Sequence, residues 1–152
     1  MNTPANAASR FGTAWLLLCA ALALHVADEA LTGFLDIYNP TVRAIRQGAP
    51  FLPLPTFTFR IWLTGLIVAV TLLSALSVPA FRSKKWMVPL AYVFGFFMLL
   101  NGCAHIAGSF YLGRLAPGVY TAPLLLAASI HLIVRARRVR PWVVRNPSIV
   151  QR

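Results

Sequence analysis

Long apolar runs alternate with shorter polar connections along the chain. The hydrophobic positions predict four helices, at about residues 11–35, 57–81, 86–112 and 119–134. A helix needs roughly 20 residues to cross the hydrocarbon core of a membrane, within a usual range of about 17–25, and the last run is the shortest. Because a backbone in lipid must satisfy its own hydrogen bonds, we expect helices rather than isolated strands. The pattern therefore predicts an all-α integral membrane bundle of four transmembrane helices, in one domain covering residues 1–152.

The polar connections differ in length and composition. Residues 36–56 form one long loop rich in proline, and Thr41–Gln47 within it predicts a short interfacial helix preceded by Pro40. Residues 113–118 predict a tight turn, since they end in a Pro-Gly pair. The tail 135–152 is basic, and we expect it to lie along the membrane surface.

Composition supports a membrane protein. Of 152 residues, 59% are hydrophobic and 11% are charged, whereas a soluble domain carries roughly a quarter charged residues. The formal net charge is +11, from 14 Lys and Arg against 3 Asp and Glu. These cations fall in the connections and the tail, as the positive-inside rule expects. We therefore expect membrane lipids as partners, and no nucleic acid.

The basic residues also predict an orientation. With four spans, both termini lie on the same side of the membrane. That side carries ten Lys and Arg residues, and the other side carries four. The ten are Arg10, Arg82, Lys84, Lys85, Arg135, Arg137, Arg138, Arg140, Arg145 and Arg152, and the four are Arg43, Arg46, Arg60 and Arg114. Both termini are therefore predicted to be cytoplasmic. An alternative treats residues 11–23 as a signal-peptide core with the cleavage-type tripeptide Ala-Leu-Ala, although the apolar run continues to Leu35.

The stretch ALALHVADEALTGFLD, residues 21–36, places polar side chains in the first apolar run. It contains every acidic residue of the chain, Asp28, Glu29 and Asp36. His25, Asp28 and Glu29 are spaced i, i+3 and i+4, so they share one helix face, and Asp36 continues their stripe. Ionisable groups inside a membrane nearly always face the bundle interior or a water-filled cavity. The stretch therefore predicts a polar site rather than a defective span.

The third apolar run supplies a partner for this stripe. Asn101 and His105 are spaced i, i+4 and share a face. Gly95, Gly102 and Ser109 recur at seven-residue steps and form a smooth flank, where another helix can approach closely.

Depth along the helices brings these polar groups to one level. At about 1.5 Å per residue, Glu29 lies roughly 27 Å and His105 roughly 28 Å from the cytoplasmic start of its helix. Arg60 and Thr121 lie near the opposite, outer starts of their own helices. The sequence thus predicts an outer-leaflet pocket. Its sharpest test is the distance from Glu29 to His105, since side-chain ends more than roughly 10 Å apart cannot share a metal through bonds of about 2.0–2.2 Å.

The segments HVADE, NGCAH and GVYT, in this order, resemble the motifs of the HXXEE-motif family of bacterial four-helix membrane proteins. That family carries H-x-x-E-E, then N-x-x-x-H, then G-x-x-T. His25 and Glu29 match the first motif, while Asp28 replaces its first glutamate and shortens the reach. The other matching positions are Asn101, His105, Gly118 and Thr121. The resemblance implies the bacterial inner membrane as the location, and it supplies candidate residues rather than a reaction.

Three classes of function compete for these residues. In a membrane-embedded enzyme, His25, Glu29 and His105 would bind Zn²⁺ or iron and activate water. Without a metal, the same groups would transfer a proton on a lipophilic small-molecule substrate. A small proton-coupled transporter is the second class, although four helices are few for a carrier unless it forms an oligomer. In the third, a structural subunit, the polar layer only ties helices together.

An enzyme-like or ligand-binding role is favoured, and whether the protein is an enzyme stays open. The candidate catalytic residues are Asp28, Glu29, Arg60, Asn101 and Thr121. Arg60 is expected to serve as counter-ion, because a guanidinium pairs with a carboxylate in a bidentate manner. The alternative is that Arg60 extends to the outer membrane surface.

Overall fold

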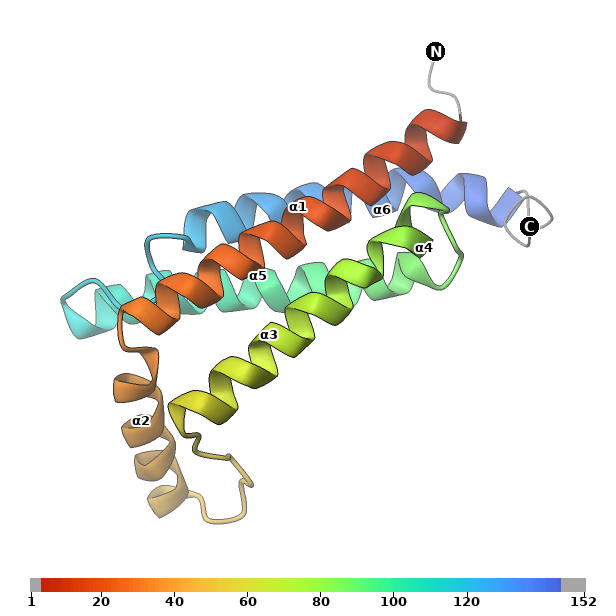
Figure 1. Cartoon of the computed structure of the whole chain (residues 1–152). Helices are drawn as coiled ribbons and strands as arrows, with labels where there is room; N and C mark the ends of the chain where they lie inside the picture. Colours follow the sequence, from red (N-terminus) through yellow and green to blue (C-terminus); the bar gives the residue numbers. More distant parts are fainter. Residues whose placement is uncertain (1–3, 146–152) are drawn as a thin grey trace.

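The computed structural model describes residues 4–145, and the regular elements in that range are all helices. They are α1 (Pro4–Leu31), α2 (Phe34–Gly48), α3 (Phe59–Ala75), α4 (Ser77–Phe81), α5 (Met87–Leu112) and α6 (Ala122–Arg145). Helices α1, α5 and α6 lie side by side, and α3 continues into α4, which packs against α1 (Figure 1). Helix α2 lies across one end of this group (Figure 1). The chain is thus all-helical, as predicted.

Three helical stretches are long and apolar enough to cross a membrane, namely Asn6–Leu31, Phe59–Phe81 and Met87–Leu112. They correspond to the first three predicted spans, and their length and composition indicate a membrane protein. The fourth predicted span, 119–134, overlaps α6, which does not join this group. Its apolar part is short, since the helix turns basic from Arg135 onward.

The predicted end of the first helix at residue 35 is wrong. Helix α1 ends at Leu31, because Gly33 adopts φ 78° and turns the chain out of the helix. Helix α2 begins at the next residue, Phe34. Asp36 therefore does not continue the polar stripe of α1, but lies exposed in the first turn of α2.

Helices α2 and α6 are both longer than the sequence pattern predicted. Helix α2 includes the predicted segment Thr41–Gln47, but Pro40 lies inside it rather than before it. Helix α6 continues past residue 134 to Arg145, so the first part of the predicted surface tail is helical. The rest of that tail, residues 146–152, lies outside the described residues.

The core forms where α1 meets α4, α5 and α6. Phe11, Trp15, Leu18 and Leu22 on α1 follow a helical spacing, and all are buried. The indole Nε1 of Trp15 donates a hydrogen bond to the carbonyl oxygen of Leu73, at 2.7 Å, and so joins α1 to α3. This packing fixes the rotation of α1, which directs its polar stripe inward at the other end.

The predicted flank of small residues on α5 is where α6 packs. A Cβ added to Gly95 would lie 2.8 Å from Cγ1 of Ile133, and one added to Gly102 would lie 2.9 Å from Cδ2 of Leu126. Helices α5 and α6 are therefore in close contact, as glycine permits. This close approach brings the start of α6 over His105, one turn further along α5.

Candidate metal centre

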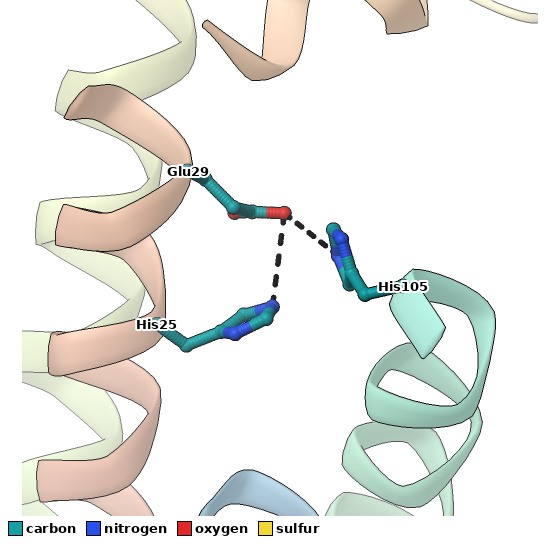
Figure 2. Close-up of side chains that lie close together, drawn as sticks. All are labelled: His25, Glu29 and His105. Atoms are coloured by element: carbon teal, nitrogen blue, oxygen red, sulfur yellow. Dashed lines mark ion pairs between the residues drawn. The ribbon is translucent and has the colours of Figure 1, made fainter. Parts of the chain in front are cut away.

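His25, Glu29 and His105 converge from two helices. Figure 2 shows Glu29 of α1 between His25, one turn earlier on the same helix, and His105 of α5. The Oε1 atom of Glu29 lies 3.0 Å from Nε2 of His105 and 3.8 Å from Nε2 of His25. The three residues are 1%, 5% and 8% exposed in chain order. The distance from Glu29 to His105 is thus far below the limit of roughly 10 Å for a shared metal. One ligand atom from each of the three residues lies within 4.8 Å of the others.

A tight turn before α6 holds the two imidazole rings from behind. Nδ1 of His105 lies 2.5 Å from the carbonyl oxygen of Pro117. Gly118 follows with φ 82°, and a Cβ there would lie 2.7 Å from Nδ1 of His105 and 2.9 Å from Cε1 of His25. The position therefore requires glycine for both its backbone conformation and its contact with the rings.

Asp28 and Thr121 form a second layer behind His25. The backbone N–H and the hydroxyl of Thr121 donate to Oδ2 of Asp28, at 3.0 Å and 2.9 Å. The same hydroxyl oxygen lies 2.9 Å from Nδ1 of His25. Asp28 thus places a carboxylate at the N-terminal end of α6, where the exposed N–H groups and the helix dipole favour negative charge. The predicted neighbours Asp28 and Thr121 are both brought to the cluster.

These hydrogen bonds determine which nitrogen of each ring carries its proton. A carbonyl oxygen only accepts, so Nδ1 of His105 must donate to Pro117. The Thr121 hydroxyl gives its proton to Asp28 and therefore accepts from Nδ1 of His25. In the neutral rings, both Nε2 atoms then present lone pairs toward Glu29, which is itself an acceptor. Three acceptor atoms share a buried space and require a cation, either a proton or a metal.

Asn101 lies at the same site, as its spacing from His105 predicted. Its side chain faces His25. Nevertheless, neither Oδ1 of Asn101 nor Nε2 of His25 has a hydrogen-bond partner among the described residues, although both atoms are buried. A buried polar atom without a partner costs about 1–3 kcal/mol. Both atoms are therefore available to an occupant of the centre.

Arg60 does not join the cluster. It lies exposed in the first turn of α3 and, within the described part of the chain, makes no ion pair with Asp28 or Glu29. The expected counter-ion contact is therefore absent from the structure. The reason is that α3 buries its Trp62 face toward α2 rather than its Arg60 face toward α1.

A cavity of about 400 Å³ adjoins Glu29 between the end of α1, α2 and the start of α3. Phe34 and Trp62 belong to its wall, and the Phe34 ring also contacts His105, with ring centroids 5.8 Å apart. The hydrophobic pattern did not indicate these two aromatic residues, or the Pro117 carbonyl, as parts of a site. The glycine that breaks α1 marked the position of Phe34, and the Pro-Gly turn marked that of Pro117, whereas no sequence signal marked Trp62.

Comparison with family models gives one match. Residues 15–132 match the family described as "Protein of unknown function with HXXEE motif". The matched range includes all of the side chains described above, from His25 to Thr121. No curated protein and no solved structure matches the chain.

Proposed function

We propose, from the premise that this chain belongs to the HXXEE-motif family, that it is a membrane-embedded metal-dependent enzyme. In this proposal His25, Glu29 and His105 hold Zn²⁺ or iron, and the substrate is a lipophilic small molecule. The observation that carries it is the convergence of two Nε2 lone pairs and one carboxylate oxygen, with both ring tautomers set by Pro117 and Thr121.

The ligand set and its spacing suit such an ion. Bonds of about 2.0–2.2 Å in a tetrahedral arrangement place ligand atoms roughly 3.4 Å apart. The distances from Glu29 to the two histidines, 3.0 Å and 3.8 Å, lie on either side of this value. Two histidines and one glutamate, with a fourth position left open, form the ligand set of catalytic rather than structural zinc sites. A metal held in this way supplies an activated water or polarises a carbonyl oxygen.

The surrounding residues have positioning roles in this proposal. Pro117 and Thr121 hold the two imidazoles in the orientation that directs Nε2 inward, as hydrogen-bonded outer partners do in metal sites. Asp28 accepts the Thr121 hydroxyl proton and so leaves the hydroxyl oxygen free to accept from Nδ1 of His25. Oδ1 of Asn101 is a buried acceptor beside His25 and would hold a water or a substrate hydroxyl.

One contact favours a second candidate function. The direct 3.0 Å approach of Glu29 to His105 is the length of a charge-assisted hydrogen bond. A proton shared by this pair would make the centre an acid–base site, for catalysis or for proton-coupled transport. The same contact in a structural subunit would only tie α1 to α5.

Metal analysis of the purified protein tests the metal centre. We expect about one Zn²⁺ or iron per chain, and a loss of affinity of more than about 100-fold in His105→Ala, since outer partners alone are worth about 10–100-fold. His131→Ala is the matched control, because His131 lies on α6 outside the cluster. Affinity should also fall on acidification, since both imidazoles must be neutral to bind. A protein that takes up neither metal when loaded would refute the metal centre and leave the proton site.

The membrane arrangement belongs to the same proposal. We propose that α6 is the fourth span and completes a four-helix bundle, with both termini cytoplasmic in the bacterial inner membrane. The start of α1, helix α4 and the end of α6 lie at one end of the molecule (Figure 1), and these segments carry Arg10, Arg82 and Arg145. In intact cells, a membrane-impermeant thiol reagent should label Arg114→Cys and not Arg82→Cys, and the reverse pattern would overturn the orientation.

A further inference from the structure

The cavity beside Glu29 has an aromatic wall. Its lining includes Phe34, Phe57, Phe59 and Trp62, which come from α2, the segment before α3 and the first turn of α3. Its volume of about 400 Å³ falls in the range of small-molecule sites, about 300–1,000 Å³. The cavity is therefore large enough for a compact ring compound beside the proposed centre.

The rings form a nearly parallel series. Phe34 and Trp62 have centroids 5.8 Å apart and planes inclined by 25°. Phe34 and Tyr38 are 5.4 Å apart at 27°, and Tyr38 and Phe57 are 5.9 Å apart at 27°. Offset stacking of this kind is favourable between flat rings. The series ends at Trp62 and Phe57, which both line the cavity, so a flat ligand can extend it there, whereas a branched aliphatic ligand has no flat face to stack.

The charged groups of the cavity have one sign. Glu29 lies at the buried end and Asp36 is exposed, and no lining residue is basic. Asn39 also lines the cavity, but its amide is already occupied, since Nδ2 donates to the Phe57 carbonyl at 2.9 Å and Oδ1 accepts from the Phe57 N–H at 3.0 Å. An acidic ligand would meet two carboxylates, and no side chain that lines the cavity is a cation that could pair with it.

A bound metal would not reverse this preference. A divalent ion in the proposed centre would offset the charge of Glu29, but Asp36 lies outside the ligand set and would still oppose an acid at the exposed end of the cavity. The aromatic faces carry negative electrostatic potential and attract cations in either case. The cavity thus discriminates by charge independently of the metal.

We infer that this cavity binds a flat, apolar ring compound that bears a positive charge or none, and that it excludes acids. The inference names the substrate class of the proposed enzyme and rests on that proposed function. Phe34 lines the cavity and also contacts the His105 ring, so a ligand in the cavity lies beside the metal ligands. In this way the aromatic series aligns the substrate with the centre.

Three flat probes of matched shape test the inference on the detergent-solubilised full chain. N-methylquinolinium is the cation, 1-methylnaphthalene the neutral isostere and 1-naphthoate the anion. We expect equilibrium dialysis to rank their affinities cation, neutral, anion, with about 10-fold or more between the cation and the anion. Asp36→Asn should narrow that ratio and leave the neutral probe unchanged. A naphthoate affinity equal to that of the cation would overturn the inference.

Variants of the wall locate the binding. Trp62→Ala and the more exposed Phe59→Ala should each weaken all three probes, while Trp86→Ala, at the other end of the molecule, should not. If Trp62→Ala fails to fold, Phe59→Ala still tests the location of binding. Unchanged binding in Phe59→Ala and any folded Trp62→Ala would refute the assignment to this cavity.

Parallel metal analysis separates the two proposals. Ranked probe binding by a protein that takes up no metal would keep the cavity and refute the metal centre. A stoichiometric metal in a protein that binds no probe, or that binds the anion as tightly as the cation, would keep the centre and refute the inference.

Discussion

The metal-ligand cluster and the cavity wall lie side by side but are built differently. The cluster, His25, Glu29 and His105, lies on α1 and α5, which both pack against α6, and it is backed by the start of α6. The wall belongs to what we call the arch, residues 34–62, which crosses one end of the molecule (Figure 1). In α2 only Val42 is buried. Within the arch, α2 is held to the segment before α3 by stacked rings and by the hydrogen bonds of Tyr38 and Asn39.

This difference suggests that the cluster binds the metal and that the arch binds the ligand. Side chains on packed helices are held in fixed geometry, which a metal site requires. Segments with few buried apolar contacts open at lower free energy, and the arch is such a segment. We therefore expect mutations behind the cluster to change metal affinity, and mutations in the arch to change ligand binding while the metal affinity remains.

Gly118→Ala should have the largest effect on the cluster. The new Cβ would lie within 3.0 Å of both imidazoles, and φ 82° costs a non-glycine residue about 1–3 kcal/mol. Metal affinity, measured by titration of the purified protein, should fall by more than the roughly 100-fold limit of a lost outer partner.

Gly113→Ala distinguishes the effect of backbone strain from the effect of contact with the imidazole rings. Gly113 also has positive φ, 62°, but a Cβ there would meet nothing within 4 Å. This variant should lose similar stability and keep its metal. Equal metal loss in both variants would show that backbone strain, rather than contact with the rings, controls the centre.

Thr121→Val should have the next largest effect. Valine keeps the shape and the backbone N–H but removes the hydroxyl between Asp28 and His25. Metal affinity should fall about 10–100-fold, as it does when an outer partner is lost. Thr121→Ser should restore most of it. If valine leaves the affinity unchanged, the orientation of His25 does not depend on this hydroxyl.

The cluster was predictable because helical spacing is regular. The i, i+4 pairs His25–Glu29 and Asn101–His105 needed only the helix repeat and a common depth, and the structure brings these residues together. Thr121 was predicted from depth and from the motif. The small-residue flank at Gly95 and Gly102 likewise predicted where a helix would pack.

The arch was not predictable by the same means. The break at Gly33 moves Asp36 from the stripe of α1 to α2, and the apolar pattern runs through it without interruption. The rotation of α3, which buries Trp62 and exposes Arg60, depends on ring stacking against Phe34 from another helix. Such contacts between distant segments leave no periodic signal in the sequence.

Asn39→Ala should affect the arch and not the cluster. It removes two hydrogen bonds between α2 and Phe57, each worth about 0.5–1.5 kcal/mol net. Binding of N-methylquinolinium should weaken because Phe57 is no longer held in the wall, while metal affinity stays unchanged. Thr121→Val is the reciprocal control: it should weaken metal binding and leave probe binding unchanged, because Thr121 does not line the cavity. A loss of metal in Asn39→Ala would show that the two regions are one unit.

Arg60→Gln should have the smallest effect, although the sequence suggested Arg60 as the counter-ion of the carboxylates. The residue is exposed and makes no ion pair with Asp28 or Glu29 in the described structure. A surface substitution of this kind changes stability by no more than about 0.5 kcal/mol, so the thermal midpoint and the metal affinity should both stay at their wild-type values. A fall in metal affinity comparable to that of Thr121→Val would mean that Arg60 reaches Glu29 or Asp28 in the membrane. The arch would then contribute charge to the cluster, and the boundary between the two regions would have to be redrawn.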